Sequence, residues 1–381
     1  MKLGIDASNI RDGGGITHLA ELLNIAEPTK YGFTEVIVWG GSKVLDRIVE
    51  RSWLIKCHLP ILEKNILYRT FWQRFQLSAI ARAEKCDILF IPGGAYGGNF
   101  KPIATISQNL LPFEWRELTR YGFSLKTIKM LLLRLIQSRT FKTADGMIFL
   151  TQYAKNTVNE IVNTTDSKTT IIPHGINSRF VASPRKQFPI EKYTKETPFR
   201  ILYVSIIEVY KHQWNVAEAV ASLSKAGLPV VLDLVGPAYP PALKILKRKM
   251  AEVDPSAKII SYIGAISHAD LHKKYTESDL AVFASSCENL PIILLEGMAS
   301  GLPVACSNLG PMPEILGQAG IYFNPLVPAD ISAAIKRLIH DPELRTKLSA
   351  MSFEKANQYS WTRCSADTFN FLSKVAVANK T

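Results

Sequence analysis

The chain alternates short apolar runs with longer stretches in which apolar residues recur every three to four positions. The short runs are of strand length, and the longer stretches have the period of amphipathic helices. This alternation predicts an α/β fold in which parallel strands are joined by helices. The predicted strands are Lys2–Asp6, Glu35–Trp39, Trp53–Cys57, Asp87–Ile91, Ile103–Ser107, Met147–Leu150, Thr169–Ile172, Arg200–Ser205, Val230–Val235, Ile259–Ile263, Asp279–Ala284 and Val304–Ser307.

The length and the pattern together predict two domains. At 381 residues the chain is about twice as long as a typical domain. We expect a first domain over residues 1–180 and a second over 200–360. The Pro-, Lys- and Glu-rich stretch between them, 181–199, has no periodic pattern and is interpreted as a linker. Trp361 begins a final helix over 361–381.

The stretch around residues 279–304 carries the clearest candidate chemistry. A strand-length apolar run is followed by a polar turn, and Pro291 then suits the first position of a helix that ends near Gly301. The first amides of this helix, at 292–294, would point at a ligand above the strand, and the helix dipole adds partial positive charge. Two carboxylates flank this predicted anion site, Glu288 in the turn and Glu296 within the apolar helix.

Glu288 and Glu296, followed by Met298-Ala299-Ser300-Gly301-Leu302-Pro303-Val304, resemble the donor-binding motif of the family-4 retaining glycosyltransferases. The resemblance implies the GT-B fold, with two Rossmann-like doubly wound domains that face each other across a cleft. In that fold the final helix packs back on the first domain. The implied reaction moves a sugar from a nucleotide-diphosphate sugar to a hydroxyl of a glycan or glycolipid. The expected setting is synthesis of bacterial surface polysaccharide or lipopolysaccharide, without a metal or a cofactor.

The resemblance also implies roles for single residues of the second domain. Glu288 would position hydroxyls of the transferred sugar, and Glu296 would hold the ribose hydroxyls. Lys211 would stabilise the departing diphosphate, and we assign Glu288 and Lys211 to catalysis. Relatives often carry an Arg where this chain has Ile206, so one cation is missing. The expected donor-binding residues are Gly14, Gly15, Gly236, Gly264, Asn289, Leu290, Pro291, Ile292 and Glu296.

The first domain is expected to contribute the acceptor side. Three consecutive glycines, Gly13–Gly15, follow the first strand, and glycine allows close approach of the backbone to a ligand. Gln108 and Asn109 stand where many relatives carry a His-Asp pair, and both side chains can hydrogen-bond hydroxyls without acting as bases. His174 lies in a Pro-x-Gly turn, where it either faces the ligand or serves only the turn.

The chain has a net charge of +12, and the first 180 residues carry most of the excess. The stretch from Arg116 to Lys142 contains seven basic residues and a single acidic one, Glu117. No zinc-finger, basic-zipper or aromatic RNA-binding signature is present, which argues against nucleic acid as a partner. Anionic lipid head groups or a charged glycolipid acceptor would explain the charge. The basic residues of the helix predicted over 124–142 scatter around its axis, so a solvated face is the alternative there.

The N-terminus lacks the apolar core of a signal peptide, and the five cysteines show no metal-ligand spacing. We therefore expect a cytoplasmic protein with free thiols, either dispersed or at the inner face of the cytoplasmic membrane. Two other classes of protein remain open at this point. One is a GT-B-shaped sugar-nucleotide epimerase, and the other is a non-catalytic binder of sugar nucleotides or polyanions.

Overall fold

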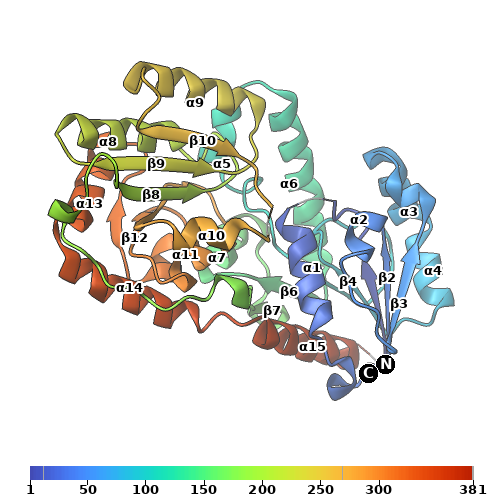
Figure 1. The fold of residues 1–381 in the computed structure, drawn as a ribbon. Coiled ribbons are helices and arrows are strands. Elements are labelled where there is room, and N and C mark those ends of the chain that lie inside the picture. The colour runs from blue at the N-terminus through green and yellow to red at the C-terminus, as the bar shows by residue number, and fades with distance from the viewer. Residues whose placement is uncertain (12, 268, 380–381) are drawn as a thin grey trace. The chain divides into compact units, whose positions relative to one another are not determined.

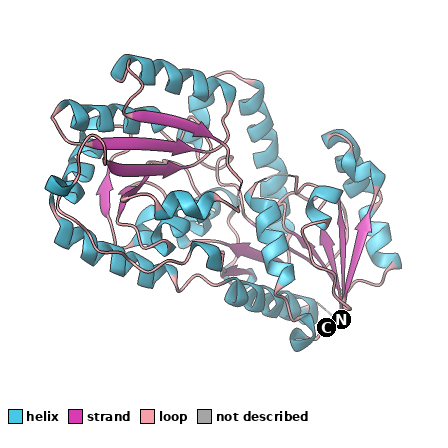
Figure 2. Cartoon of the chain, in the orientation of Figure 1, coloured by secondary structure: helices cyan, strands magenta, loops and turns pink. Residues whose placement is uncertain are grey.

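The computed structural model describes residues 1–11, 13–267 and 269–379, and it divides into two compact units. The first unit comprises Met1–Gly175 together with Ser360–Thr381, and the second comprises Ile176–Tyr359. Each unit is a parallel sheet covered by helices, as Figures 1 and 2 show. The α/β prediction is therefore confirmed in both halves. Within the described residues, no helix has both the length and the apolar character needed to cross a bilayer.

The sheet of the first unit has seven strands in the order β3-β2-β1-β4-β5-β6-β7, and each neighbouring pair is parallel. The order reverses between β1 and β4, which is the position where open parallel sheets bind ligands. The strands are β1 (Lys2–Asp6), β2 (Glu35–Gly40), β3 (Leu54–His58), β4 (Ile88–Ile91), β5 (Ile103–Ile106), β6 (Gly146–Phe149) and β7 (Thr169–Ile171).

The final helix, α15 (Trp361–Ala378), packs in the first unit against α1 and β6. Gly146 permits this packing, because a Cβ there would lie 2.6 Å from Val375 Cγ2. The other helices of this unit are α1 (Gly14–Asn24), α2 (Ser42–Leu45), α3 (Ile66–Phe75), α4 (Leu77–Ala83), α5 (Trp115–Leu118), α6 (Leu125–Thr143) and α7 (Gln152–Val162). Two of these helices, α3 and α4, meet at Gln76.

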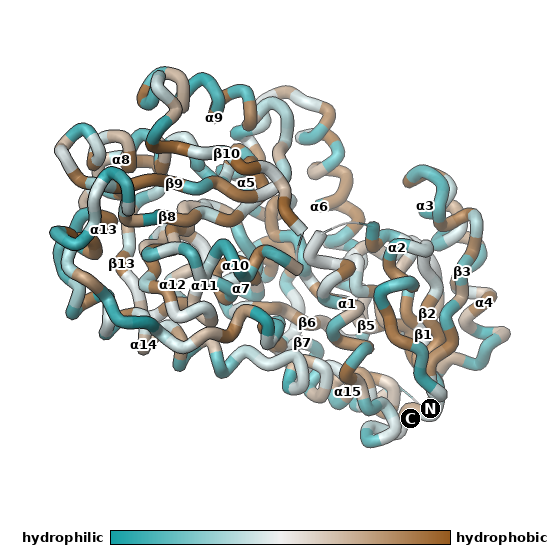
Figure 3. The backbone as a smooth tube through the Cα atoms, in the orientation of Figure 1, coloured by the Kyte–Doolittle hydropathy of each residue, from teal (hydrophilic) through white to brown (hydrophobic). Residues whose placement is uncertain are grey.

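The sheet of the second unit has six parallel strands in the order β10-β9-β8-β11-β12-β13. Here β8 and β11 are neighbours although they are far apart in sequence, so the loops that follow them meet at one edge of the sheet. Apolar residues dominate the central strands of both sheets (Figure 3). The strands are β8 (Phe199–Val204), β9 (Val230–Val235), β10 (Ile260–Gly264), β11 (Leu280–Phe283), β12 (Val304–Ser307) and β13 (Ile321–Phe323).

Seven helices accompany this sheet among the described residues. They are α8 (Gln213–Lys225), α9 (Pro240–Val253), α10 (Leu271–Thr276), α11 (Ile292–Ala299), α12 (Met312–Leu316), α13 (Pro328–His340) and α14 (Pro342–Ala356). Helix α11 starts one residue after Pro291, which has an extended backbone and occupies the N-cap. Gly301, with φ of 65°, follows its C-terminal end as predicted.

The stretch 181–199, interpreted from its composition as a linker, packs instead on the second unit, and the first unit ends at Gly175 rather than at residue 180. The Ala182 N–H donates to the Ala299 carbonyl at 3.0 Å. A Cβ on Gly301 would lie 2.7 Å from the Ala182 carbonyl, so a glycine is required for this close approach. The polar composition of the stretch did not reveal these contacts, which also include the side chains of Arg185 and Tyr193 on Asp279.

Arg345, on α14, holds a later part of the same stretch. Its side chain is completely buried. Its guanidinium donates to the carbonyls of Leu338, Ile339 and Phe188, and Nε donates to Gln187 Oε1 at 3.0 Å. Burial lowers the pKa of Arg345. A buried cation is tolerated here because several acceptors surround it.

We predict that Arg345→Met lowers the free energy of unfolding by roughly 3 kcal/mol or more, because buried carbonyls then lose their donor. Chemical denaturation of the full chain measures this. Arg337→Met is the matched control, since Arg337 is exposed on α13, and it should stay within about 0.5 kcal/mol of the parent. An Arg345→Met variant as stable as this control would show that the guanidinium does not anchor residues 187–188.

Candidate active site

The pairing of β8 with β11 brings together Lys211 and Glu288. Lys211 lies in the loop after β8, Glu288 lies in the loop after β11, and their side chains form an ion pair. The pair is largely withdrawn from solvent, with 5% of the Lys211 side chain and 14% of the Glu288 side chain exposed. Lys211 Nζ also lies 5.1 Å from the ring centroid of Phe283 and 5.4 Å from that of Tyr210. The two residues assigned to catalysis are thus in direct contact.

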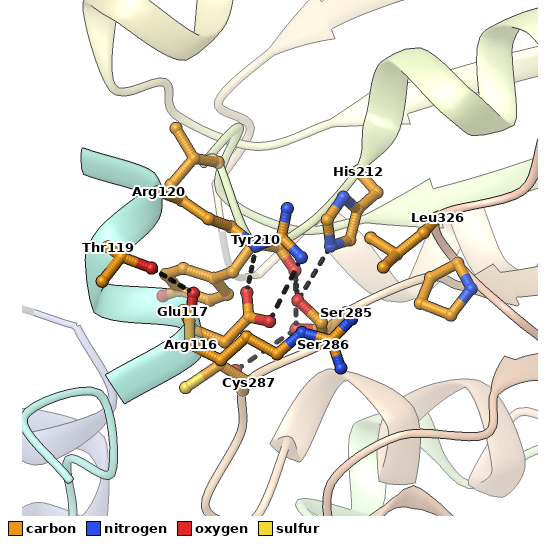
Figure 4. A network of polar contacts seen from close by, with 12 residues as sticks. Arg116, Glu117, Thr119, Arg120, Tyr210, His212, Ser285, Ser286, Cys287 and Leu326 are labelled. Atoms are coloured by element: carbon orange, nitrogen blue, oxygen red, sulfur yellow. Dashed lines mark hydrogen bonds and ion pairs between the residues drawn. The ribbon is translucent and has the colours of Figure 1, made fainter. Parts of the chain in front are cut away.

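The carbonyl of Tyr210 binds the two loops to each other (Figure 4). It accepts hydrogen bonds from the Ser286 N–H at 2.8 Å, from Ser286 Oγ at 3.3 Å and from Ser285 Oγ at 3.4 Å. One residue later, the Lys211 carbonyl accepts from the Tyr203 hydroxyl at 2.7 Å. The backbone on both sides of the Lys211 Cα is therefore fixed, which limits where the ammonium group can lie.

His212 completes this arrangement, and no motif in the sequence pointed to it. Its Nε2 lies 2.8 Å from Ser286 Oγ, and its backbone is left-handed, with φ of 52°. The Ser286 hydroxyl uses its hydrogen in the bond to the Tyr210 carbonyl. Its oxygen can therefore only accept from His212, so Nε2 of the imidazole is the donor. A non-glycine residue in this conformation is strained, and such strain persists only where surrounding contacts impose it.

The N-terminus of α11 differs in one respect from the expectation. The N–H of Leu294, which we expected to face a ligand, donates to the Pro291 carbonyl at 3.0 Å. Within the described chain, the N–H groups of Ile292 and Ile293 make no hydrogen bond. The correction follows from Pro291, because an N-cap carbonyl accepts the first intrahelical bonds. Two amides rather than three therefore remain for an anion, with Asn289 and Leu290 buried in the turn before them.

Glu296 lies one turn into α11 and is 3% exposed. Its Oε2 accepts a hydrogen bond from the Tyr275 hydroxyl at 3.1 Å, and that hydroxyl also lies 3.3 Å from the Ile293 carbonyl. Burial, together with the Glu296 carboxylate, raises the pKa of Tyr275 well above its usual value. The carboxylate in the apolar run therefore has a partner inside the protein, as a buried carboxylate requires.

Two predicted glycines follow the strands beside this site and differ in their surroundings. Gly236, after β9, has φ of 146°, and a Cβ on it would lie 2.1 Å from the Ser205 carbonyl. Its N–H donates to the Gly264 carbonyl at 2.9 Å. Gly264 has φ of 83°, and a Cβ on it would meet no atom within 4 Å. A glycine is therefore required at position 236 because a Cβ would clash with the Ser205 carbonyl. At position 264 a glycine is favoured because the backbone has a positive φ. Ile206, at the position of the missing cation, is partly exposed.

In the first unit, two of the predicted acceptor-side residues meet around a residue that we did not predict. Gln108 Nε2 lies 3.0 Å from Nδ1 of His18, and the His18 ring lies 4.6 Å from that of His174 between centroids. Trp361 stacks beside both histidines. Burial lowers the pKa of His18 to about 4 and that of His174 well below its usual value, so both imidazoles are neutral near pH 7. Asn109 is exposed, and its Oδ1 accepts from the Leu111 N–H.

The glycine loop of the first unit borders the same cluster. Gly13 has φ of 65°, and α1 begins at Gly14. A Cβ on Gly15 would lie 3.4 Å from Gln108 Oε1, whereas one on Gly14 would meet no atom within 4 Å. Among the residues that the structure describes, nothing therefore excludes a side chain at Gly14, and we expect a bound ligand to exclude one.

Comparison with known proteins connects this geometry to a family. Residues 185–354, almost the whole second unit, match the family described as glycosyl transferases group 1. The second unit is therefore a domain of the group 1 glycosyltransferase type. The matched range contains Lys211, Glu288 and Glu296, so the ion pair and the buried carboxylate lie in the glycosyltransferase domain.

Relatives and solved structures agree with this assignment. The chain is 34% identical to the O-antigen chain mannosyltransferase B of Escherichia coli over 111 residues, which are 29% of each chain. The matched segments cover less than half of the length of the first curated relatives. Over 99% of this chain and 100% of the other, the fold matches the sucrose-phosphate synthase of Thermosynechococcus elongatus, with a TM-score of 0.76 and 16% identity. The Anabaena HepE complex with UDP-glucose matches over 100% and 99%, with a TM-score of 0.67 and 16% identity. The fold is GT-B, as predicted.

We predict that His212 fixes the position of Lys211. His212→Ala loses the bond to Ser286 and keeps the strained backbone, whereas His212→Gly loses the bond but relieves the strain. The Gly variant should therefore be more stable than the Ala variant by about 1 kcal/mol in denaturant unfolding. Both should bind a sugar-nucleotide donor more weakly than the parent. Equal stability of the two variants, or parental donor affinity in both, would contradict this role.

Proposed function

We propose that the chain is a retaining glycosyltransferase that moves a sugar from a nucleotide-diphosphate donor to a hydroxyl of a glycan or lipid-linked glycan. The observation that carries the proposal is the buried Lys211–Glu288 pair beside the N-terminus of α11 in a group 1 domain. The relative in Escherichia coli is named as an O-antigen chain mannosyltransferase, and Anabaena HepE is solved with UDP-glucose. These names support a sugar-nucleotide donor and a role in bacterial surface polysaccharide synthesis.

The reaction breaks the bond between the anomeric carbon and the diphosphate oxygen, and negative charge grows on the diphosphate as it leaves. Preorganised donors aimed at developing charge are usually a large contribution to catalysis. Lys211 and the amides of Ile292 and Ile293 would supply them here. Glu288 would position hydroxyls of the transferred sugar while it holds Lys211. The leaving-group charge is then met by groups of the chain itself, so we propose a reaction independent of metal ions.

The test starts from the full chain and a panel of UDP-, GDP-, ADP- and CMP-sugars. A donor that binds only the folded state raises the melting temperature, which selects the donor. That donor is then incubated with a bacterial glycolipid extract, with and without EDTA, and the product linkage is read by nuclear magnetic resonance. We expect transfer with retained anomeric configuration in both conditions. A donor that stabilises the protein and is epimerised without transfer, or is left unchanged, would refute the proposal.

We predict that Lys211→Met lowers turnover at saturating donor by roughly a hundredfold or more, because the developing charge is left to the helix amides. The change also leaves Glu288 without its cation, which can lower stability. Lys211→Met combined with Glu288→Gln removes both charges and should recover stability without recovering turnover. Lys225→Met, at an exposed position on α8, is the control and should keep parental turnover. Turnover of Lys211→Met within a few-fold of the parent would exclude Lys211 from the chemistry.

Glu296 is proposed to hold the donor ribose. Glu296→Gln should weaken donor binding by roughly 1–3 kcal/mol, because charge-assisted hydrogen bonds to the ribose hydroxyls become neutral ones. Titration calorimetry measures the affinity. Tyr275→Phe is the comparison, since it removes the partner of Glu296 inside the protein and should change donor affinity less. If Glu296→Gln alters stability and leaves donor affinity unchanged, the carboxylate is only the partner of Tyr275.

A further inference from the structure

His18 is almost completely buried, although it lies in the second turn of α1. Its ring is flanked by two aromatic neighbours: the ring centroids of His18 and His174 are 4.6 Å apart, and those of His18 and Trp361 are 5.8 Å apart. Gly175 allows this packing, because a Cβ there would lie 2.0 Å from the Trp361 backbone nitrogen. Protein interiors are close-packed, so the His18 imidazole cannot turn freely and its two nitrogens point in fixed directions.

Among the described residues, His18 has a single hydrogen-bond partner, which is Gln108 in the loop after β5. Nε2 of the amide lies 3.0 Å from Nδ1 of the imidazole. The amide nitrogen can only donate, so Nδ1 accepts, and the neutral ring carries its hydrogen on Nε2. Nδ1 of His174 has no partner within the described chain, so the contact of His174 with the His18 ring is one of packing.

The orientation of the Gln108 amide is set from both sides. A glutamine amide has two orientations of similar energy about its last bond, which exchange its nitrogen and its oxygen. In the structure Nε2 is directed at His18 and Oε1 at the glycine loop, where a Cβ on Gly15 would lie 3.4 Å from Oε1. The first intrahelical bond of α1 runs from the Thr17 N–H to the Gly13 carbonyl at 3.5 Å, so the amides before Thr17 leave partial positive charge there. This charge favours Oε1 over the amide nitrogen beside Gly15, and His18 favours the same orientation by accepting from Nε2.

The amide oxygen of Gln108 is available to a ligand. No described residue donates to it, Gln108 is partly exposed, and Gly13 and Gly14 in the loop beside it are exposed. An amide oxygen accepts hydrogen bonds and cannot donate them, so it pairs with a hydroxyl and repels a phosphate or carboxylate oxygen. The buried imidazole and the helix terminus therefore present an acceptor at this place rather than a donor.

We propose that His18 is a positioning residue for a sugar hydroxyl: it orients the Gln108 amide so that Oε1 accepts the hydrogen of a substrate hydroxyl at the glycine loop. The proposal rests on the proposed function for the substrate, because sugar transfer brings hydroxyls of both the transferred sugar and the acceptor to the protein. Donor binding and acceptor kinetics separate these two sources. Gln108 touches the substrate, whereas His18 acts through Gln108 and does not take up a proton.

The tautomer of His18 is the first test, and it requires no substrate. Long-range nitrogen–proton correlation spectra of the full chain near pH 7 show which ring nitrogen carries the hydrogen, and the His18 signals are those that His18→Asn removes. Burial lowers the pKa of His18 to about 4, so the ring is neutral under these conditions. We expect the hydrogen on Nε2 and an unprotonated Nδ1. A hydrogen on Nδ1 would overturn the proposal, since the amide would then turn its oxygen to His18 and its nitrogen to the ligand.

Two variants separate the hydrogen bond of His18 from its packing. His18→Asn keeps an acceptor, Oδ1, at about the position of Nδ1, whereas His18→Leu fills the site without a polar atom. We expect His18→Leu to lose at least about tenfold in kcat/KM, which is the size of one hydrogen bond, and His18→Asn to stay within about threefold of the parent. A purely structural role predicts the opposite order, because burying an amide costs more than burying a leucine. That order would overturn the proposal.

Donor affinity and the KM for the acceptor identify the hydroxyl. In His18→Leu, weaker stabilisation by the sugar nucleotide alone places it on the transferred sugar, and a higher acceptor KM with parental donor affinity places it on the acceptor. Parental values of both would overturn the proposal. His340→Leu is the control, since His340 is exposed on α13, and it should keep parental values throughout. The tautomer is measured without sugar transfer, so a failure of this proposal is distinguishable from a failure of the proposed function.

Discussion

The burial of the Lys211 ammonium group is the constraint on which the second unit's active-site region depends. A cation removed from water is costly unless an opposite charge and hydrogen-bond acceptors surround it. Glu288 supplies the charge, and it can do so only because β8 and β11 are neighbours. The Tyr210 carbonyl, with its three donors from Ser285 and Ser286, then keeps the loops in register. A diphosphate bound as proposed above would compete with Glu288 for the same ammonium group.

The parts of the site that the sequence predicted are those encoded locally. An apolar run, a polar turn, Pro291 and Gly301 specify a strand followed by a helix, and the structure contains β11 and α11 in these positions. Lys211 and Glu288 lie in separate motifs, and the parallel α/β topology explains why they meet. The role of each predicted residue in binding or chemistry stays a prediction, which the variants above address.

The parts that could not be predicted depend on contacts between distant residues. His212 combines a left-handed backbone with a bond to a serine 74 positions later, and neither feature is visible in the residues around it. His18 was missed because nothing in the sequence distinguishes this histidine from the other residues of the predicted helix. The packing of residues 181–199 on the second unit was missed for a related reason: Gln187 and Phe188 are held by a buried arginine far along the chain.

The close packing at Gly301 has a consequence for how α11 can move. The C-terminal end of this helix is held where the chain enters the second unit, through Ala182 and through the bond from Ser300 Oγ to the Phe180 carbonyl. Its N-terminal end, by contrast, carries amides that are not used within the described chain. An eight-residue helix is about 12 Å long, so a tilt of about 10° around the held end would move those amides by about 2 Å. A change of this size in the distance from donor to acceptor is enough to break a hydrogen bond. A small rotation of α11 about its held end would therefore change how closely these amides approach an anion bound as proposed above.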